Sequence, residues 1–421
     1  MKNELKWKAL SERLGKHGEE ICSAMKELYS VFGPEIVDWY ASLYDPCHGM
    51  WYHARSAQEN EGYLPDIESL CDAAGFLQEM GATEGKAWYE IFPDWLKEKI
   101  GKFVYGLQDE DGYFYHPQWG KEIGNLRKSR DLGTCIRFLR YLGITPKYKI
   151  PIATSDDEEP NYDLKNAPIQ FRSVENYRRY LSDMDFVNKA YRFGSELSSC
   201  MGEVETYSKL LGEDLVKITL DTLTSYQRPD NGIWHPEANR YGGNGAQKIA
   251  KIFNWYDKKL PYQEKGIESL MTIINSDEVP DAVVQVYNPW HALASFIKNV
   301  EITGATKEEM DALMEKIYRW APEAIRQSAK QIRLFKQADG ALSYLPNCSC
   351  YTKCGAPCAV PETAEGDVNG TSCGSAALIA SIYAALNVTD YAVPVYSFAD
   401  MERFLSIVEA RELDYQERQG N

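Results

Sequence analysis

The apolar positions of the chain recur at the spacing of an amphipathic helix. Between residues 67 and 77, apolar side chains fall three or four positions apart, as on one face of a helix. The stretch from 210 to 223 has much the same pattern. Runs of β-branched residues that alternate strictly with polar ones are scarce, which argues against a large sheet. The pattern therefore predicts an all-α protein.

Four polar segments between the predicted helices share a common pattern. Each contains an Asp, a Gly within a few residues, and an aromatic or apolar residue close behind that Gly. These segments are 45–53, 108–117, 227–236 and 337–344. The glycine spacing indicates a unit of about 60 residues, the length of a helical hairpin with its loops, if two further turns lie near 170–171 and 287–291. Because Asp-Gly and Asn-Gly favour tight turns, the sequence predicts about six helical hairpins joined by short β-hairpins.

This repeat resembles that of the α/α toroids, the fold family of terpenoid cyclases, protein prenyltransferase β-subunits and (α/α)6 carbohydrate-active enzymes. The resemblance covers about residues 40–390. It implies a single toroidal domain over 1–421, with a surface loop at about 151–168 and a polar tail at about 415–421. An open α-solenoid is the alternative.

Within this family, two branches lack support from the motifs. The Asp-x-Asp-Asp and Asp-Asp-x-x-Asp motifs of terpenoid cyclases are absent. Asp367 and Cys373 are six positions apart, unlike the closely spaced Asp-x-Cys of the prenyltransferase zinc site. The resemblance therefore points to the carbohydrate-active branch.

Charge and hydropathy narrow the classes of partner. The chain has 421 residues with a net charge of −16, and an acidic chain without a basic run is a poor nucleic-acid binder. No apolar stretch approaches the roughly 18 residues that span a bilayer, and the first residues lack the apolar core of a signal peptide. The ten cysteines are most simply reduced thiols. We expect a cytoplasmic protein with neither nucleic-acid nor membrane partners.

Five of the six histidines lie at or near the predicted turns. They are His48, His53, His116, His235 and His291. A closed ring places equivalent turns at one end, so these side chains would meet around one mouth. The alternative is that each histidine only caps a helix or fills its own turn. We expect the mouth to hold the active site.

The first and last turns supply most of the catalytic candidates. We expect His53 or Tyr115 to move protons, and Asp66 or Asp367 to act as acid or base. Asp66 also lies at a helix start, where the helix dipole favours a carboxylate for purely structural reasons. In a closed ring the two ends of the chain are neighbours, so His53 and Asp367 should lie close together.

The binding candidates surround these catalytic residues. Arg55 and Asn60 are expected to hold a carboxylate or hydroxyls, and Trp51 and Trp234 to stack on sugar rings. Basic residues after the second and third turns favour an anionic ligand in a protein of net charge −16, although they equally suit an ordinary surface. The remaining candidates are Tyr52, Glu68, His116, Asp131, His235, Tyr241, Lys248, His291, Glu365 and Asn369.

Four cysteines lie close together near the last turn. They are Cys348, Cys350, Cys354 and Cys358. Their spacing lacks the paired Cys-x2-Cys of zinc knuckles, so a structural metal, oxidisable thiols and no special role all remain open. We expect no cofactor and no catalytic metal.

These features predict an enzyme that cleaves a glycosidic bond in a small saccharide or glycoside, including one that carries a uronate. Hydrolysis and β-elimination both fit the candidates. In architecture the chain would be similar to unsaturated glucuronyl hydrolases, by fold and not by motif. A terpenoid-cyclase-like enzyme with a different acid would instead have a site lined by aromatics and few charges. A non-enzymatic binding toroid would point its turn residues away from any shared pocket.

Overall fold

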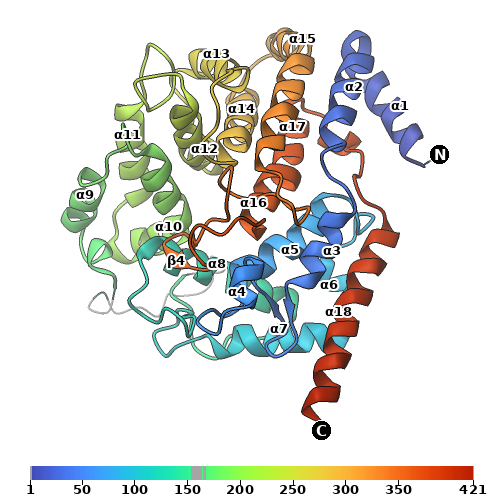
Figure 1. Ribbon diagram of the computed structural model, residues 1–421. Helices are drawn as coiled ribbons and strands as arrows, with labels where there is room; N and C mark the ends of the chain where they lie inside the picture. Colours follow the sequence, from blue (N-terminus) through green and yellow to red (C-terminus); the bar gives the residue numbers. More distant parts are fainter. Residues whose placement is uncertain (1, 153–163, 165–166, 421) are drawn as a thin grey trace.

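The computed structural model describes residues 2–152, 164 and 167–420 (Figure 1). The predicted surface loop at 151–168 therefore lies largely outside the described residues. Helices make up most of the described part, which confirms the all-α prediction. The helices are α1 (Lys2–Leu14), α2 (Gly18–Tyr29), α3 (Glu35–Ser42), α4 (Arg55–Gln58), α5 (Ile67–Glu79), α6 (Trp88–Ile91), α7 (Asp94–Gly106), α8 (Asn125–Tyr141), α9 (Val174–Ser182), α10 (Ala190–Leu211), α11 (Leu215–Tyr226), α12 (Arg240–Trp255), α13 (Gln263–Ile274), α14 (Val284–Ile302), α15 (Lys307–Ile332), α16 (Val368–Ser372), α17 (Leu378–Ala385) and α18 (Phe398–Gln419).

Strands form only short hairpins in the part of the chain that the structure describes. β1 (Tyr44–Asp45) pairs antiparallel with β2 (Met50–Trp51), and β3 (Thr352–Lys353) pairs with β4 (Ala356–Pro357). The first of these hairpins is the first predicted turn. Among the described helices, none combines the length and the apolar character needed to cross a bilayer.

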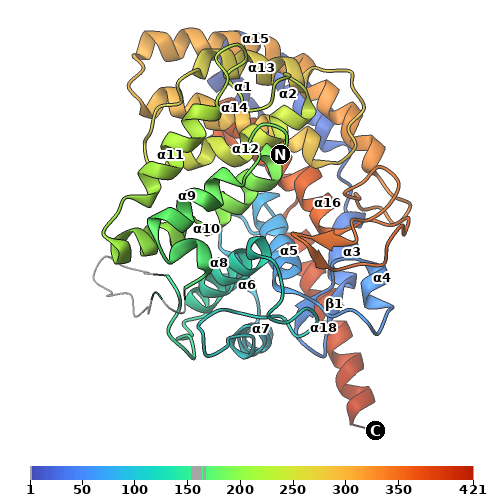
Figure 2. The same cartoon turned by 90° about the vertical axis from the view of Figure 1, so that its left-hand side faces the viewer.

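Six helical segments, called the inner helices here, pack in a cyclic order. α5 packs against α8, α8 against α10, α10 against α12, α12 against α14, and α14 against α17. A π-helical turn at Cys373–Ala377 joins α17 to α16, and α16 packs back against α5. Helices α7, α11, α13 and α15 lie at the periphery in Figures 1 and 2.

Three of the predicted turns fold alike. In each, the side chain before the Gly accepts a hydrogen bond from the backbone N–H after it, and these side chains belong to Asp111, Asn231 and Asp339. The three glycines have φ values of +84°, +70° and +89°, a region that side chains disfavour. At Gly232 a Cβ would also lie 2.2 Å from the backbone N of Gly266. The sequence pattern thus marks a repeated turn geometry.

Two predicted positions differ from the structure. Residues 287–291 lie inside α14, so His291 is a helix residue and not a turn residue. The described part of the predicted polar tail, 415–420, is helical up to Gln419, and the end of α18 projects from the body of the molecule (Figure 1). Contacts between residues four apart stabilise this end, because Gln416 donates to Glu412 at 2.7 Å.

Helices near the beginning of the chain pack against helices near its end. α2 packs against α15, and α3 packs against α18. The hydroxyl of Tyr29 donates to the carbonyl O of Val393 at 2.6 Å, and the hydroxyl of Tyr40 lies 2.7 Å from Oγ of Ser372. The expectation that the two ends of the chain become neighbours is confirmed.

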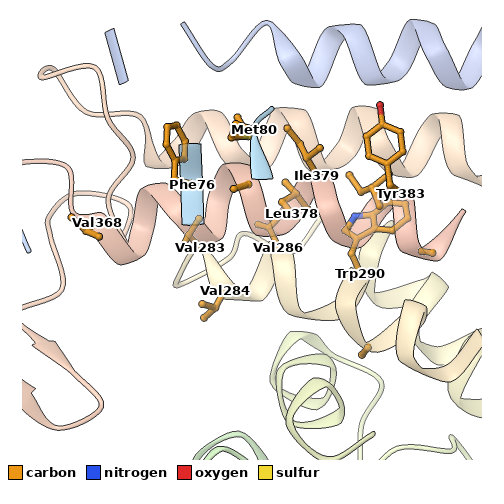
Figure 3. Packing of buried hydrophobic residues seen from close by; sticks show 14 of the residues in the cluster. Phe76, Met80, Val283, Val284, Val286, Trp290, Val368, Leu378, Ile379 and Tyr383 are labelled. Atoms are coloured by element: carbon orange, nitrogen blue, oxygen red, sulfur yellow. The ribbon is translucent and has the colours of Figure 1, made fainter. Parts of the chain in front are cut away.

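The inner helices bury their apolar faces against neighbouring helices. Val286 and Trp290 of α14 belong to the same buried cluster as Leu378 and Tyr383 of α17, and Figure 3 shows them close together. Nε1 of Trp290 donates to Oγ of Ser328 on α15 at 2.8 Å, so the buried indole keeps a partner. The other face of the same helices carries polar residues, and it is this face that forms the site.

Candidate functional site

A cavity of about 850 Å³, the central cavity, lies between the inner helices. Side chains from α5, α8, α10, α12, α14 and α16, from the π-helical turn and from the segment 344–354 line it. Polar residues at helical spacing share one face of an inner helix, and this face borders the cavity. Its charged residues, tyrosines, histidine and amides are Asp72, Gln78, Glu79, Tyr89, Arg130, Arg137, Tyr141, Tyr191, Arg192, Gln247, Lys248, Lys251, Tyr287, Asn288, His291, Tyr344, Lys353 and Asn369.

Positive charge dominates this wall. Among the described residues, six cationic side chains line the cavity against two carboxylates. Lys353 pairs with Asp72, and Arg130 pairs with Glu68 behind the wall. These two cations are therefore largely neutralised by the protein itself.

Four further cations of the cavity have no carboxylate within ion-pair distance in the described part of the chain. They are Arg137, Arg192, Lys248 and Lys251. Burial, reinforced by the charge of Arg130, lowers the pKa of Lys248 to about 8. Burial and the charges of Lys248 and Arg130 lower the pKa of Lys251 to about 7. An anion in the cavity would relieve this repulsion, so the wall favours an anionic ligand.

A hydrogen-bonded pair on α14 faces the same space. The hydroxyl of Tyr287 lies 2.9 Å from Nδ1 of His291. Burial and the charges of Lys251 and Lys248 lower the pKa of His291 to about 4, so the imidazole is neutral at pH 7. Burial raises the pKa of Tyr287 well above its ordinary value, so the phenol keeps its proton. A phenol beside a neutral imidazole can pass a proton along its hydrogen bond.

A proline and a buried arginine set the position of this pair. Pro289 lies within α14 and has no N–H, so the carbonyl O of Gln285 lacks its helical donor. Nη1 of Arg240 donates to that oxygen at 3.1 Å, and the same guanidinium donates to two more backbone carbonyls. Arg240 therefore anchors the first turn of α14, directly before Tyr287 and His291.

The two carboxylates of the cavity differ. Asp72 is held by Lys353. Glu79, seven residues further along α5, has no cation partner among the described residues. Desolvation within the cavity and the charge of Asp72 raise the pKa of Glu79 to about 7.

His53 and Asp367 are neighbours, as expected, but neither lines the central cavity. Nε2 of His53 lies 3.4 Å from Oδ1 of Asp367, and both side chains are at most 1% exposed. Asp367 caps α16, and its carboxylate accepts from the backbone N–H groups of Gly370, Tyr344 and Cys350. Its oxygens thus order the last turn and the start of α16, and the predicted role in acid–base chemistry has no geometric support.

Asp66 likewise has a structural place. It caps α5 by accepting from the N–H groups of Glu68 and Ser69, and Arg127 donates to it at 2.7 Å. Although burial raises it, the charge of Arg127 holds the pKa of Asp66 well below its usual range. Asp66 therefore carries no proton near neutral pH and lies away from the cavity, contrary to the predicted role.

The other candidates divide by location. Lys248, His291 and Asn369 line the central cavity, where a ligand would contact them. Trp51 and Trp234 are fully buried in the hydrophobic core, and each indole donates to a backbone carbonyl. Neither tryptophan can stack on a sugar, so these two predictions are wrong.

The remaining turn candidates lie outside the cavity. Arg55 and Asn60 are exposed, and Tyr52 is half-buried. The candidates with local partners are Tyr115 (Asp111), His116 (Pro65), Tyr241 (Asp281), His235 (Glu237), Glu68 (Arg130), Asp131 (Arg127) and Glu365 (Ser56 and Ser349). Most of these partners are side chains or a backbone carbonyl, and backbone N–H groups donate to His235 and Glu365, so these candidates are engaged in contacts within the fold.

Sequence reasoning missed most residues of the cavity wall. Those missed include Glu79, Arg137, Tyr191, Arg192, Lys251 and Tyr344. The available signal was periodic: on α8, polar residues Arg130, Arg137 and Tyr141 share one face. Such a face is indistinguishable from a solvent-exposed one until the neighbouring helices are placed.

All ten cysteines lie in the described part of the chain and are free thiols. Cys350 and Cys354 line the cavity, Cys358 is buried, and Cys348 is partly exposed. Among the described residues, no group of three or more His, Cys, Asp or Glu side chains is arranged to hold a metal ion. The structure thus offers no metal site for the cysteine cluster in this part of the chain.

Comparisons of this chain with protein-family profiles, with curated proteins and with solved structures find no match. The function is therefore inferred from the chemistry of the cavity.

Proposed function

We propose that this chain is a carbohydrate-active enzyme of the α/α-toroid type that binds an acidic oligosaccharide in the central cavity and cleaves it by β-elimination. The observation that carries the proposal is the set of cations without carboxylate partners that line the same cavity as the Tyr287–His291 pair. We further propose that it acts in the cytoplasm on a small imported saccharide.

The packing order supports the toroid. The inner helices contact one another cyclically from α5 back to α16, and the ends of the chain meet. Closed helical rings leave a space at their axis, where side chains from distant parts of the chain converge. The central cavity occupies that place.

The cavity wall supports an acidic sugar as the ligand. The arginines and lysines of the wall offer donors for carboxylates, and Tyr89 and Tyr191 add aromatic rings to the same wall. The abundance of charge argues against a terpenoid-cyclase-like function, which requires an aromatic site with few charges. In the described part of the chain the turn residues form no shared pocket, as a non-enzymatic toroid would have it; the support for an enzyme is instead that polar side chains of the inner helices converge on one cavity.

The proposed elimination uses groups that line the same cavity. Arg137 and Arg192 hold the uronate carboxylate and stabilise the charge that develops there. The proton on C5 moves to the Tyr287 oxygen while the Tyr287 proton moves to Nδ1 of His291. The C4–O4 bond breaks, a C4–C5 double bond forms, and the leaving oxygen takes a proton from the Lys251 ammonium. The proton on His291 then returns to Lys251 through solvent, which restores the starting state.

Hydrolysis is the second candidate, and one observation favours it. Glu79 has its pKa raised to about 7, as a general acid requires. A glycosidase ordinarily uses two carboxylates, whereas the second cavity carboxylate, Asp72, is held by Lys353. Among the described residues, the cavity therefore lacks the second free carboxylate that hydrolysis needs, which favours elimination.

The test is activity on a panel of hyaluronan, chondroitin sulfate, heparin, alginate and polygalacturonate oligosaccharides. Elimination creates a double bond conjugated to the carboxylate, so ultraviolet absorbance should rise in step with new reducing ends. We expect Glu79→Gln to retain most of this activity. New reducing ends without absorbance, abolished by Glu79→Gln, would establish hydrolysis instead. No cleavage of any acidic oligosaccharide would refute the enzyme proposal.

The elimination also predicts a pH profile. It needs His291 neutral, which holds above about pH 4, and Lys251 protonated, which holds below about pH 7. For the free enzyme, kcat/KM should therefore rise through about pH 4 and fall above about pH 7. Lys330→Met, on the outer helix α15, should leave both limbs unchanged. A kcat/KM that stays constant from about pH 4 to about pH 9 would contradict the assignment of these two groups.

A further inference from the structure

A second cavity of about 600 Å³, the distal compartment, adjoins the central cavity. The two share lining residues, among them Glu79, Lys251, Tyr287 and His291. The distal compartment extends toward the C-terminal ends of α12, α14 and α17, because residues near those ends line it. The shared wall makes the two spaces parts of one channel, with the Tyr287–His291 pair at their junction.

The distal compartment has its own binding chemistry. Trp255, the last residue of α12, is 52% exposed and lines it. Nζ of Lys251 lies 5.3 Å from the centroid of the Trp255 ring. Lys298 lines the same space without a carboxylate partner in the described part of the chain. Two carboxylates, Glu79 and Glu301, also line the compartment, so an acidic group would be bound locally, at the lysines beside the half-exposed indole.

The position of Lys298 on α14 bears on the length of the ligand. It follows His291 by seven residues on α14, which corresponds to about 10 Å along the helix axis. A single pyranose ring does not span that distance. We therefore expect a ligand that contacts both residues to extend over more than one sugar unit.

We propose that the distal compartment binds the sugar units next to the cleaved linkage, through stacking on Trp255 and an ion pair with Lys298. The substrate is thus a linear oligosaccharide with acidic groups on successive repeats, and not a disaccharide or a simple glycoside. This inference rests on the proposed function, since it places the cleaved linkage beside Tyr287 and His291.

The experiment measures binding of di- and hexasaccharides of hyaluronan, chondroitin sulfate, heparin, alginate and polygalacturonate by calorimetry, in the Tyr287→Phe background so that no ligand is consumed. The best-bound hexasaccharide should bind about 10-fold or more tightly than its disaccharide. Trp255→Ala and Lys298→Met should each remove most of that difference while leaving the disaccharide affinity unchanged. Lys330→Met, which lies outside both cavities, is the matched control for the loss of a lysine charge.

The outcomes separate the two proposals. If no acidic saccharide of either length binds, the proposed function is wrong, and the proposed distal binding site is refuted as well. If both lengths bind with equal affinity, or if Trp255→Ala weakens both equally, the cavity ligand stands and the distal site alone is refuted. A neutral maltohexaose that binds as tightly as the acidic hexasaccharide would overturn the role of Lys298.

Discussion

Replacing Arg127 by methionine is expected to lower the free energy of unfolding by about 3–5 kcal/mol. The Arg127 side chain is fully buried, and its guanidinium donates to Asp66 at 2.7 Å and to Asp131 at 2.8 Å. Without it, two carboxylates stay buried with no cation between them. Urea denaturation followed by circular dichroism measures the loss.

A second variant isolates the cause. Burial raises the pKa of Asp131 to about 7 even beside Arg127, so its charge is only just tolerated. Adding Asp131→Asn to Arg127→Met removes one buried charge and should restore part of the lost stability. Arg140→Met, at the exposed end of the same helix, should change stability by less than about 0.5 kcal/mol. Equal effects of Arg127→Met and Arg140→Met would contradict the network.

The pH dependence of this network has a defined sign. The pKa of Asp66 is lowered in the folded state, so its stabilising contribution is present above the unfolded value near 3.8 and is lost as pH falls through the folded value. The pKa of Asp131 is raised, so the folded state binds the extra proton, and its contribution falls as pH rises from about 4 to about 7. Asp131→Asn should therefore flatten the decline in stability over that upper range.

Replacing Tyr287 by phenylalanine is expected to lower kcat by about 10²–10⁴-fold on the substrate that the panel identifies. The variant keeps the ring and its packing but loses the hydroxyl that lies 2.9 Å from Nδ1 of His291. Proton transfer from C5 then has no acceptor in the proposed place. Initial rates of the rise in ultraviolet absorbance give kcat, and calorimetry gives the affinity of the enzyme for the same oligosaccharide.

The affinity is the control that separates chemistry from binding. It should change by less than about threefold, because cations on the wall and not the phenol hold the carboxylate. Tyr105→Phe, near the end of the peripheral helix α7 and outside the cavity lining, is the matched tyrosine variant and should leave kcat within about twofold. Unchanged turnover in Tyr287→Phe would remove the pair from the mechanism, whatever the substrate.

The catalytic residues predicted at the turns were wrong because a polar residue at a turn can serve either catalysis or helix capping. Asp66 and Asp367 each begin an inner helix, where the first N–H groups lack partners within the helix. A carboxylate at that position is strongly stabilised by capping, so its presence needs no catalytic reason. In the sequence, an Asp that caps a helix and an Asp that acts as a catalytic acid or base look the same. Only the hydrogen bonds in the structure distinguish the two roles.

Local chemistry let the sequence predict several features of this protein. Helical periodicity indicated the all-α class, and the Asp-Gly and Asn-Gly turns marked hairpins that share one geometry, since both depend on residues close together in the chain. The expected proximity of His53 and Asp367 followed from the repeat. Which polar helix faces meet each other was decided only by the tertiary structure. Lys251, Tyr287 and Arg137 lie on three different helices, and their convergence depends on long-range packing that no local pattern encodes.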